Sequence, residues 1–241
     1  MTDRNDLSFW FPKLAATGIP VPRTSWITTE VDLLALVDGM RPAGFDAFLR
    51  EIEDKARGVG YPLFLRTGHG SGKHEWAKTC CVRNRFELAQ HVVALVEWSH
   101  LVDMFGLPTE TWVVREMLSP TVGFHAFNGR MPIGRERRYF INNGKVVGHH
   151  PYWPPASIEQ PTNEDWELIL EELNRETAEE VAHLTALSEQ AGAAFEGSWS
   201  IDWMWTVERG WVCIDMADAW DSFRWSEYPT APTDADLRAA A

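Results

Sequence analysis

The stretch that decides the fold of this chain runs from Ser198 to Phe223 and reads SWSIDWMWTVERGWVCIDMADAWDSF. Two apolar segments flank a Glu-Arg-Gly turn, so we expect two strands joined as a hairpin. Each strand carries one acidic residue, Asp202 or Asp215, in apolar surroundings. A buried carboxylate is costly unless a cation or hydrogen-bond donors compensate it, and two on neighbouring strands can converge on one hard cation such as Mg²⁺. The alternative is that both carboxylates lie at strand ends and face water.

Composition limits the classes of protein to which the chain can belong. The 241 residues are 45% hydrophobic, enough to bury a core in one large domain or two small lobes, and they contain no apolar run that could cross a membrane. The chain opens without a signal-peptide pattern, so we expect a cytoplasmic protein. Its net charge of −13 argues against broad binding to nucleic acid or to an anionic membrane. Three cysteines, two of them adjacent, form neither a disulfide framework nor a metal knuckle.

Helical segments mix with antiparallel hairpins along the chain, which predicts an α+β fold in two lobes. We place the junction near Leu107 to Thr111, with an N-terminal lobe in residues 1–110 and a C-terminal lobe in residues 111–241. Hydrophobic periodicity predicts helices over residues 7–19, 30–58, 86–105 and about 163–192. Besides the late hairpin, strands are expected over residues 61–66, 76–82, 111–118, 135–141 and 145–150.

A glycine-rich segment from Arg66 to Lys73, RTGHGSGK, connects two predicted strands. Its glycines expose backbone N–H groups beside the donors of Ser71 and Lys73, which suits a loop that covers phosphate oxygens. The segment is not a P-loop, because the first required glycine falls on Thr67, His74 replaces the Ser or Thr, and a strand follows instead of a helix. The alternative interpretation is an ordinary mobile turn.

A second candidate is the segment RERRYF, which begins at Arg135. Strand alternation puts Glu136 and Arg138 on one face. Such a pair is usually a surface ion pair that contributes little to stability, but if the face lines a cleft, Arg138 suits a phosphoryl group. The histidines are not spaced as zinc ligands, and no nucleophilic triad can be assembled.

In their order, these segments resemble the ATP-grasp superfamily, and the resemblance covers most of the chain. Its members hold ATP between two α+β lobes and use it to activate a carboxylate as an acylphosphate, which an amine then attacks. The strand YPLFLR, which ends at Arg66, resembles the first phosphate-binding strand of the superfamily, with arginine where lysine is usual. That replacement is typical of a clade with phage and bacterial members.

The resemblance implies roles for individual residues through the motifs that they match. The ATP-binding residues would be Arg66, Ser71 and Lys73, the hinge residues Glu116, Met117 and Leu118, and Arg138, with Lys73 and Arg138 also catalytic. Asp202 and Asp215 match the late acidic residues that hold Mg²⁺. The asparagine expected two positions later is Ala217, which leaves Asp218 as the candidate third ligand, although a regular strand would direct it to the other face. An acidic residue for the ribose is missing after Leu118.

The function that the resemblance implies is an ATP-dependent carboxylate–amine ligase. Its substrates would be a small-molecule or peptide carboxylate and an amine, and His74 or His150 could assist proton transfer from the amine. The order of motifs, Glu-x-Arg, then Asp, then Ile-Asp, also resembles the order in ATP-grasp assembly chaperones, which bind ATP without ligation. An ATP-binding protein of that kind is therefore the alternative. The sequence identifies neither the substrates nor the oligomeric state.

Overall fold

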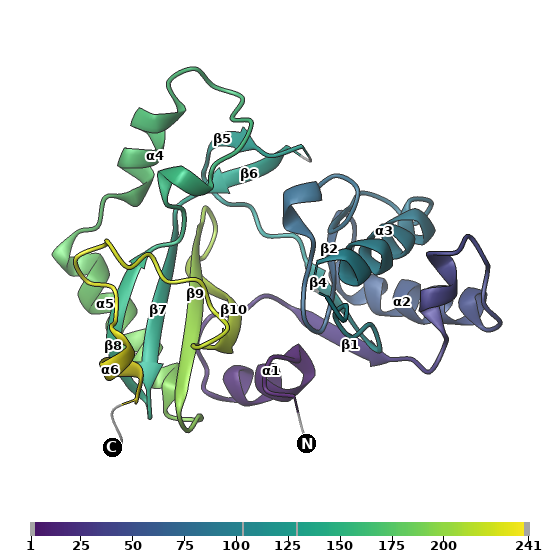
Figure 1. Cartoon of the computed structure of the whole chain (residues 1–241), viewed down its shortest axis with the longest axis horizontal. Coiled ribbons are helices and arrows are strands. Elements are labelled where there is room, and N and C mark those ends of the chain that lie inside the picture. Colours follow the sequence, from purple (N-terminus) through teal and green to yellow (C-terminus); the bar gives the residue numbers. More distant parts are fainter. Residues whose placement is uncertain (1–2, 103, 129, 239–241) are drawn as a thin grey trace.

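The computed structural model describes residues 3–102, 104–128 and 130–238 and contains two four-stranded sheets, each with its own helices (Figure 1). The first sheet has the order β1-β4-β2-β3, with every neighbouring pair antiparallel. Its strands are β1 (Thr24–Thr28), β2 (Leu63–Thr67), β3 (Cys81–Val82) and β4 (Thr111–Glu116). The helices α2 (Phe45–Val59) and α3 (Leu88–Leu101) bury their apolar sides against it. We call this unit the small lobe.

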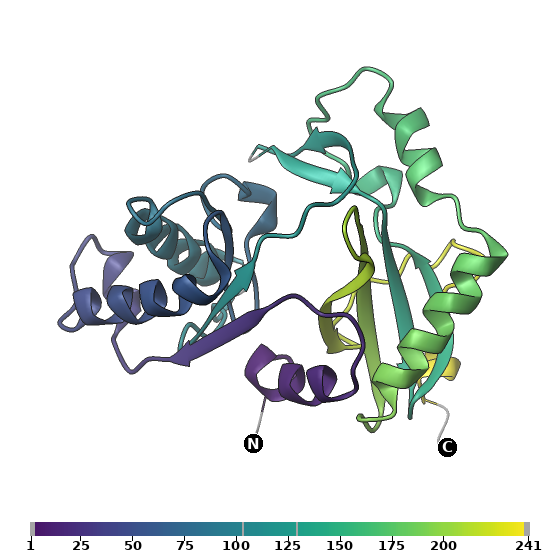
Figure 2. The same cartoon turned by 180° about the vertical axis from the view of Figure 1, so that it is seen from behind.

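The second sheet has the order β10-β9-β7-β8 and is also antiparallel throughout. Its strands are β7 (Glu136–Asn142), β8 (Lys145–Pro151), β9 (Ser198–Thr206) and β10 (Gly210–Asp218), so the predicted late hairpin is β9–β10. Helix α5 (Ala178–Gly192) covers β7 and β8, and α6 (Asp234–Arg238) contacts β7 (Figure 2). We call this unit the large lobe.

Two further elements complete the molecule. A hairpin of β5 (Val122–Ala126) and β6 (Met131–Gly134), which the sequence did not predict, packs against α4 (Trp166–Asn174) and has its own small core. We count this hairpin, α4 and the residues that pack in this core, Tyr152 and Trp153 among them, as part of the large lobe. Helix α1 (Leu7–Ala16) lies beside the second sheet. None of the helices in the described part of the chain is both long enough and apolar enough to span a membrane.

The division of the chain differs from the expected boundary at residues 110 and 111 in two places. Strand β4 follows that boundary, yet it lies inside the sheet of the small lobe, paired with β1 on one side and β2 on the other. Helix α1 precedes the boundary, yet Leu7, Trp10 and Leu14 share a core cluster with buried residues of β7, β9 and β10, which also includes Val113 of β4. A buried strand needs backbone partners on both sides, so pairing and not chain order decides which lobe it joins.

Two predicted helices are interrupted by local chemistry. The helix expected over residues 30–58 divides into a 3₁₀ turn (Leu33–Leu36) and α2, because Pro42 and the positive φ of 87° at Gly44 break it. The helix expected over residues 163–192 divides into α4 and α5. The Thr177 side chain accepts a hydrogen bond from the Glu180 amide and so starts α5 as its N-cap.

Two other predicted elements are shorter than expected. The strand expected over residues 76–82 is reduced to β3, because residues 73–75 form a 3₁₀ turn and the chain after it continues as turns. The helix expected over residues 86–105 is α3, which ends at Leu101. Position 103 of that expected helix lies outside the described residues.

His150 on β8 makes the stability of the fold dependent on pH. The residue is 1% exposed, with Nδ1 2.7 Å from the Pro151 carbonyl and Nε2 3.3 Å from the Trp225 amide, so the neutral ring donates once and accepts once. Burial lowers the pKa of His150 to about 4, whereas an unfolded histidine titrates near pH 6.5. Below pH 6.5 the unfolded chain therefore binds a proton that the folded protein does not. We expect this histidine to remove on the order of 3 kcal/mol of stability as the pH falls from 6.5 to 4.

The measurement is the unfolding free energy from urea titrations across that pH window. His150→Gln should flatten the curve between pH 6.5 and 4, whereas His125→Gln, which replaces an exposed histidine, should leave the wild-type slope. Equal slopes in all three proteins would contradict the assignment.

Candidate functional site

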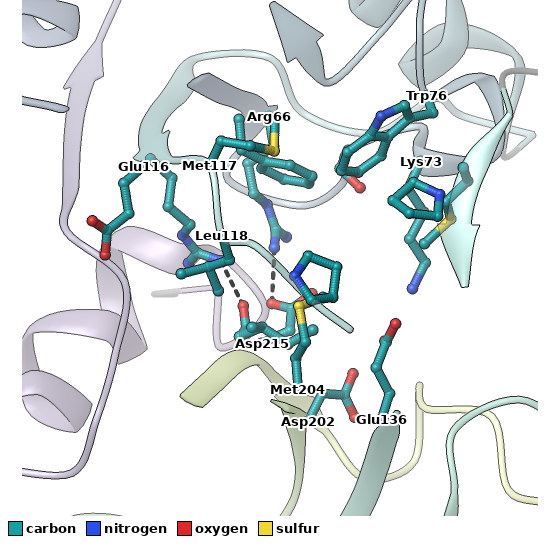
Figure 3. A pocket seen from close by; sticks show the side chains of 17 residues that line it. Arg66, Lys73, Trp76, Glu116, Met117, Leu118, Glu136, Asp202, Met204 and Asp215 are labelled. Carbon is teal, nitrogen blue, oxygen red and sulfur yellow. Dashed lines mark hydrogen bonds and ion pairs between the residues drawn. The ribbon is translucent and has the colours of Figure 1, made fainter. Parts of the chain in front are cut away.

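A cavity of about 90 Å³ lies between the two lobes and is lined by residues of both. Figure 3 shows side chains of β2 and the glycine-rich segment facing those of β7, β9 and β10 across it. The structure brings most of the sequence-predicted site residues to this cavity. Those that line it are Arg66, Ser71, Lys73, Glu116, Met117, Leu118, Asp202 and Asp215.

A bulge in β10 brings the two late aspartates together. Asp215 lies opposite Asp202 in the register of the hairpin, and Cys213 lies opposite Trp203, so Ile214 is an extra residue between them. Residues directly opposite each other share a face of a sheet, and a shift of one residue would turn Asp215 to the other face. The Ile214 carbonyl accepts a hydrogen bond of 2.5 Å from Nη1 of Arg115, which satisfies a backbone oxygen displaced from the ladder by the bulge.

Each of these aspartates is paired with an arginine. Arg138 binds Asp202 with two hydrogen bonds of 2.7 Å, from Nε and Nη2, across the β7–β9 pair, where the two residues are register partners. Nη1 of Arg66 donates to Asp215 at 2.9 Å from the other lobe, and the Arg66 side chain is only 6% exposed. Arg138 therefore reaches the site through Asp202, although it does not itself line the cavity.

Asp218, the predicted third metal ligand, lies elsewhere. Its carboxylate pairs with Arg4 at 3.0 Å and also accepts from the Trp220 amide. A position three residues beyond Asp215 on a regular strand points to the opposite face, which explains why it does not reach the cavity. Within residues 3–102, 104–128 and 130–238, no group of three or more acidic, histidine or cysteine side chains could hold a metal ion.

Glu116, at the end of β4, ties the two lobes together through its side chain. Its carboxylate accepts from Arg23, at the entry to β1, and from Arg209, in the β9–β10 turn, at 2.6 to 2.8 Å. These interactions outweigh the effect of burial and lower the pKa of Glu116. Its amide donates to the Arg23 carbonyl and is not free for a ligand. Within the predicted hinge, Met117 and Leu118, which also line the cavity, therefore offer the better backbone groups for ligand binding.

The glycine-rich segment reaches across the cavity to the large lobe. Nζ of Lys73 donates to the Tyr152 hydroxyl at 2.7 Å. His74 stacks on Phe127 with ring centroids 4.0 Å apart. A Cβ added at Gly70 would lie 2.5 Å from the ring of Trp98 on α3, so the glycine lets the segment pack closely against the small lobe.

Two residues of the site were not among the sequence-predicted set. The side chain of Arg115 lines the cavity and is buried, and the burial together with the charge of Arg66 lowers its pKa to about 10. Glu136, at the start of β7, also lines the cavity and is 2% exposed, and burial raises the pKa of its carboxyl. Strand alternation already placed Glu136 beside Arg138, but no local pattern distinguishes a cavity face from a solvent face.

Both residues have buried polar atoms without partners. Nη2 of Arg115 and Oε2 of Glu136 make no hydrogen bond to any of the residues that the structure describes. Leaving a buried donor or acceptor unsatisfied costs about 1–3 kcal/mol, and more for a charged group. A donor and an acceptor left open in one cavity indicate a polar ligand site.

The two histidines considered for proton transfer have other contacts. Burial lowers the pKa of His74, whose ring stacks on Phe127. His150 is enclosed by the Pro151 carbonyl and the Trp225 amide. Neither is among the residues that line the cavity.

Comparison with known proteins indicates the fold. No protein-family model and no curated protein matches the sequence. Among solved structures, the chain is similar to C-terminally truncated Cdc123 from Schizosaccharomyces pombe, at 11% identity and a TM-score of 0.56, over 90% of this chain and 86% of that one. The biotin carboxylase domain of Hydrogenobacter thermophilus 2-oxoglutarate carboxylase, solved with MgADP, matches at 13% identity and a TM-score of 0.52. N5-carboxyaminoimidazole synthase from Aspergillus clavatus, solved with ADP, matches at 10% identity and a TM-score of 0.51.

These similarities confirm the predicted fold class: the chain has an α+β ATP-grasp fold, with two lobes and a cavity between them. Each of the two enzymes matches 89% of this chain, but the chain spans only 39% and 44% of their respective lengths. At these identities the similarity concerns the fold alone.

Proposed function

We propose that the chain binds Mg²⁺ and ATP in the cavity and acts as an ATP-dependent carboxylate–amine ligase. The observation that carries the proposal is that two buried arginines of the small lobe, Arg66 and Arg115, face Asp202 and Asp215 of the large lobe in one interlobe cavity. Buried guanidinium groups suit phosphate oxygens. The same proposal assigns the chain to the clade of the superfamily that has arginine, here Arg66, where lysine is usual.

The residues present fit a nucleotide chemically, but the cavity has to open. At about 90 Å³ it is smaller than the roughly 300–1,000 Å³ of typical small-molecule sites. The contacts of Lys73 and His74 with the large lobe close it, so ATP entry requires the glycine-rich segment to move away from that lobe. The open Nη2 donor of Arg115 would then be satisfied by a phosphate oxygen.

Asp202 and Asp215 would hold the metal. One or two carboxylates plus phosphate oxygens and water form the usual donor set for Mg²⁺, so the absence of Asp218 from the cavity does not exclude it. Bound there, the metal would neutralise charge on the phosphates and template the phosphoryl group. Arg66 and Arg138, which neutralise these aspartates in this structure, would be free to bind phosphate instead.

Phosphoryl transfer depends on positioning and charge neutralisation more than on a protein nucleophile. Arg66, Arg115, Arg138 and Lys73 supply that charge from both lobes. Met117 and Leu118 offer an apolar wall and backbone groups for the base. The carboxylate and the amine would meet beyond the phosphates, toward Glu136.

One observation favours a second candidate, an ATP-binding protein that does not ligate. The chain spans 86% of Cdc123 but less than half of the two enzymes with which it was compared. An assembly chaperone of the ATP-grasp type would need the nucleotide site without an acceptor site.

Calorimetric titration with MgATP, followed by an assay of ADP and phosphate release, tests both candidates. We expect MgATP to bind, and release to be stimulated by a mixture of amino acids or peptides that supplies carboxylate and amine. Binding without stimulated release by any mixture would support the second candidate. If neither MgATP nor MgADP binds, both are wrong.

A further inference from the structure

The ammonium group of Lys73 lies in a cage built by the large lobe. Nζ donates to the Tyr152 hydroxyl at 2.7 Å and lies 4.0 Å from the centroid of the Tyr152 ring and 4.8 Å from that of Trp153. Aromatic faces at these distances attract a cation. Lys73 belongs to the small lobe, so its side chain fills a site whose walls belong to the other lobe.

Glu136 is the acidic wall of this cage. Its Oε1 accepts from Nε1 of Trp153 at 3.1 Å, which fixes the carboxylate against the ring. Figure 3 shows the carboxylate directed toward the Lys73 ammonium. Its Oε2 is buried and, in the part of the chain that the structure describes, lacks a hydrogen-bond partner. This carboxylate oxygen is therefore available to a hydrogen-bond donor that is larger than the Lys73 ammonium or that lies closer to Glu136.

The charges around the cage select a cation over an anion. Glu136 and Asp202 both favour the charged form of Lys73, and with Tyr152 they outweigh the burial that opposes it, so the pKa of Lys73 is raised. A phosphate or carboxylate ligand would meet the same negative charges, and the Arg138 guanidinium, 4.7 Å from the centroid of the Tyr152 ring, is already paired with Asp202. The phenolic oxygen of Tyr152 accepts from the N–H donor of Lys73, and a quaternary ammonium group has no such donor.

We propose that the cage of Tyr152, Trp153 and Glu136 binds the ammonium group of a primary amine, and that Lys73 occupies this site only while nucleotide is absent. The inference rests on the proposed function, in which Lys73 moves to the phosphates as the cavity opens. Its departure leaves the Trp153 ring, the Tyr152 phenol and the Glu136 carboxylate without the ammonium group, while Arg138 stays over the Tyr152 ring. The amine substrate would then enter next to the phosphates, where its attack is needed.

The first experiment uses Lys73→Ala and n-butylammonium as the probe. The substitution empties the cage and keeps its walls, so butylammonium should bind this variant and raise its Tm, whereas the wild type without nucleotide should show no shift. Ligand-observed NMR of the probe provides a readout independent of stability, and circular dichroism checks that the variant folds, with Lys73→Ser as a second variant. Butyrate, of equal length and opposite charge, should not bind.

Matched variants locate the binding. Lys78→Ala removes an exposed lysine five positions further along the chain and should not bind the probe. In the Lys73→Ala background, Glu136→Gln and Tyr152→Phe should each weaken binding about tenfold, because the first replaces a charge-assisted hydrogen bond with a neutral one and the second removes a hydrogen bond to a charged group. Tetramethylammonium should also bind about tenfold more weakly than butylammonium. Equal binding of butylammonium and butyrate, or binding unchanged by Glu136→Gln, overturns the proposal.

The wild type is then titrated with butylammonium in the presence of Mg²⁺ and a non-hydrolysable ATP analogue. Probe binding that appears only with the analogue supports the exchange of Lys73 for an amine. Binding of the analogue without binding of the probe overturns it. If the analogue itself does not bind, the proposed function is wrong, while the Lys73→Ala experiment still decides whether the cage takes an ammonium group.

Discussion

Replacing Arg137 with alanine is expected to lower the free energy of unfolding by about 3–5 kcal/mol, because it removes one of the two arginines paired with buried Glu180 and takes the donor away from three carbonyls. The Arg137 side chain is 0% exposed and lies on the face of β7 opposite to Arg138. Nε donates to Glu180 of α5 at 2.7 Å, and the remaining N–H groups bind carbonyls, among them those of Leu173 and Arg175. This one side chain therefore joins the large sheet to α5 and to the end of α4.

Urea denaturation measures the effect, with Lys145→Ala as the control. Lys145 pairs with Glu189 of the same helix at 3.2 Å, but its side chain is 76% exposed, so its loss should cost less than about 0.5 kcal/mol. A loss below about 1 kcal/mol in Arg137→Ala would show that the buried cluster contributes little to stability.

Replacing Arg66 with alanine is expected to weaken the binding of MgATP about 100-fold, the usual order for truncating a buried, hydrogen-bonded charge at a ligand site. Arg66 projects from β2 into the cavity and is paired with Asp215. Its removal takes away a phosphate-binding cation and leaves an additional unpaired negative charge where the phosphates would lie. Calorimetric titration gives the dissociation constant directly.

Two comparisons make this result specific. Arg57→Ala removes an arginine of the small lobe whose side chain is 80% exposed and should leave the dissociation constant unchanged. Arg66→Lys keeps the charge without the planar fork and should fall between alanine and the wild type. An affinity in Arg66→Ala within threefold of the wild type, with the fold intact, would remove Arg66 from the nucleotide site.

The sequence predicted the local elements better than their boundaries. The late hairpin, the first helix and the strand that ends near Arg66 follow from apolar periodicity and turn residues, which act over a few positions. The hairpin β5–β6 was missed, because Val122–Ala126 and Met131–Gly134 are short and lie among Gly and Pro. Helix boundaries failed where Pro42 or an N-cap interrupts a continuing hydrophobic pattern.

For the site, the sequence indicated residue types and their order, but it could not assign faces. It singled out Arg138 but not its neighbour Arg137, and Asp218 alongside Asp215. It noted Glu136 without selecting it. The role of each of these residues depends on whether its side of the strand lines the cavity or is covered by a helix. Neighbouring residues of one strand point to opposite sides, so their roles differ.

The sequence by itself determined the α+β class, the apolar hairpin with its two carboxylates and the glycine-rich segment, because these depend on interactions between residues close in the chain. Only the tertiary structure decided that a bulge at Ile214 turns Asp215 to the side of Asp202 and that Arg66, 149 positions earlier, pairs with it. It also decided that Lys73 enters an aromatic cage of the other lobe. Strand register and the approach of two lobes are set by the packing of distant segments, which no local pattern encodes.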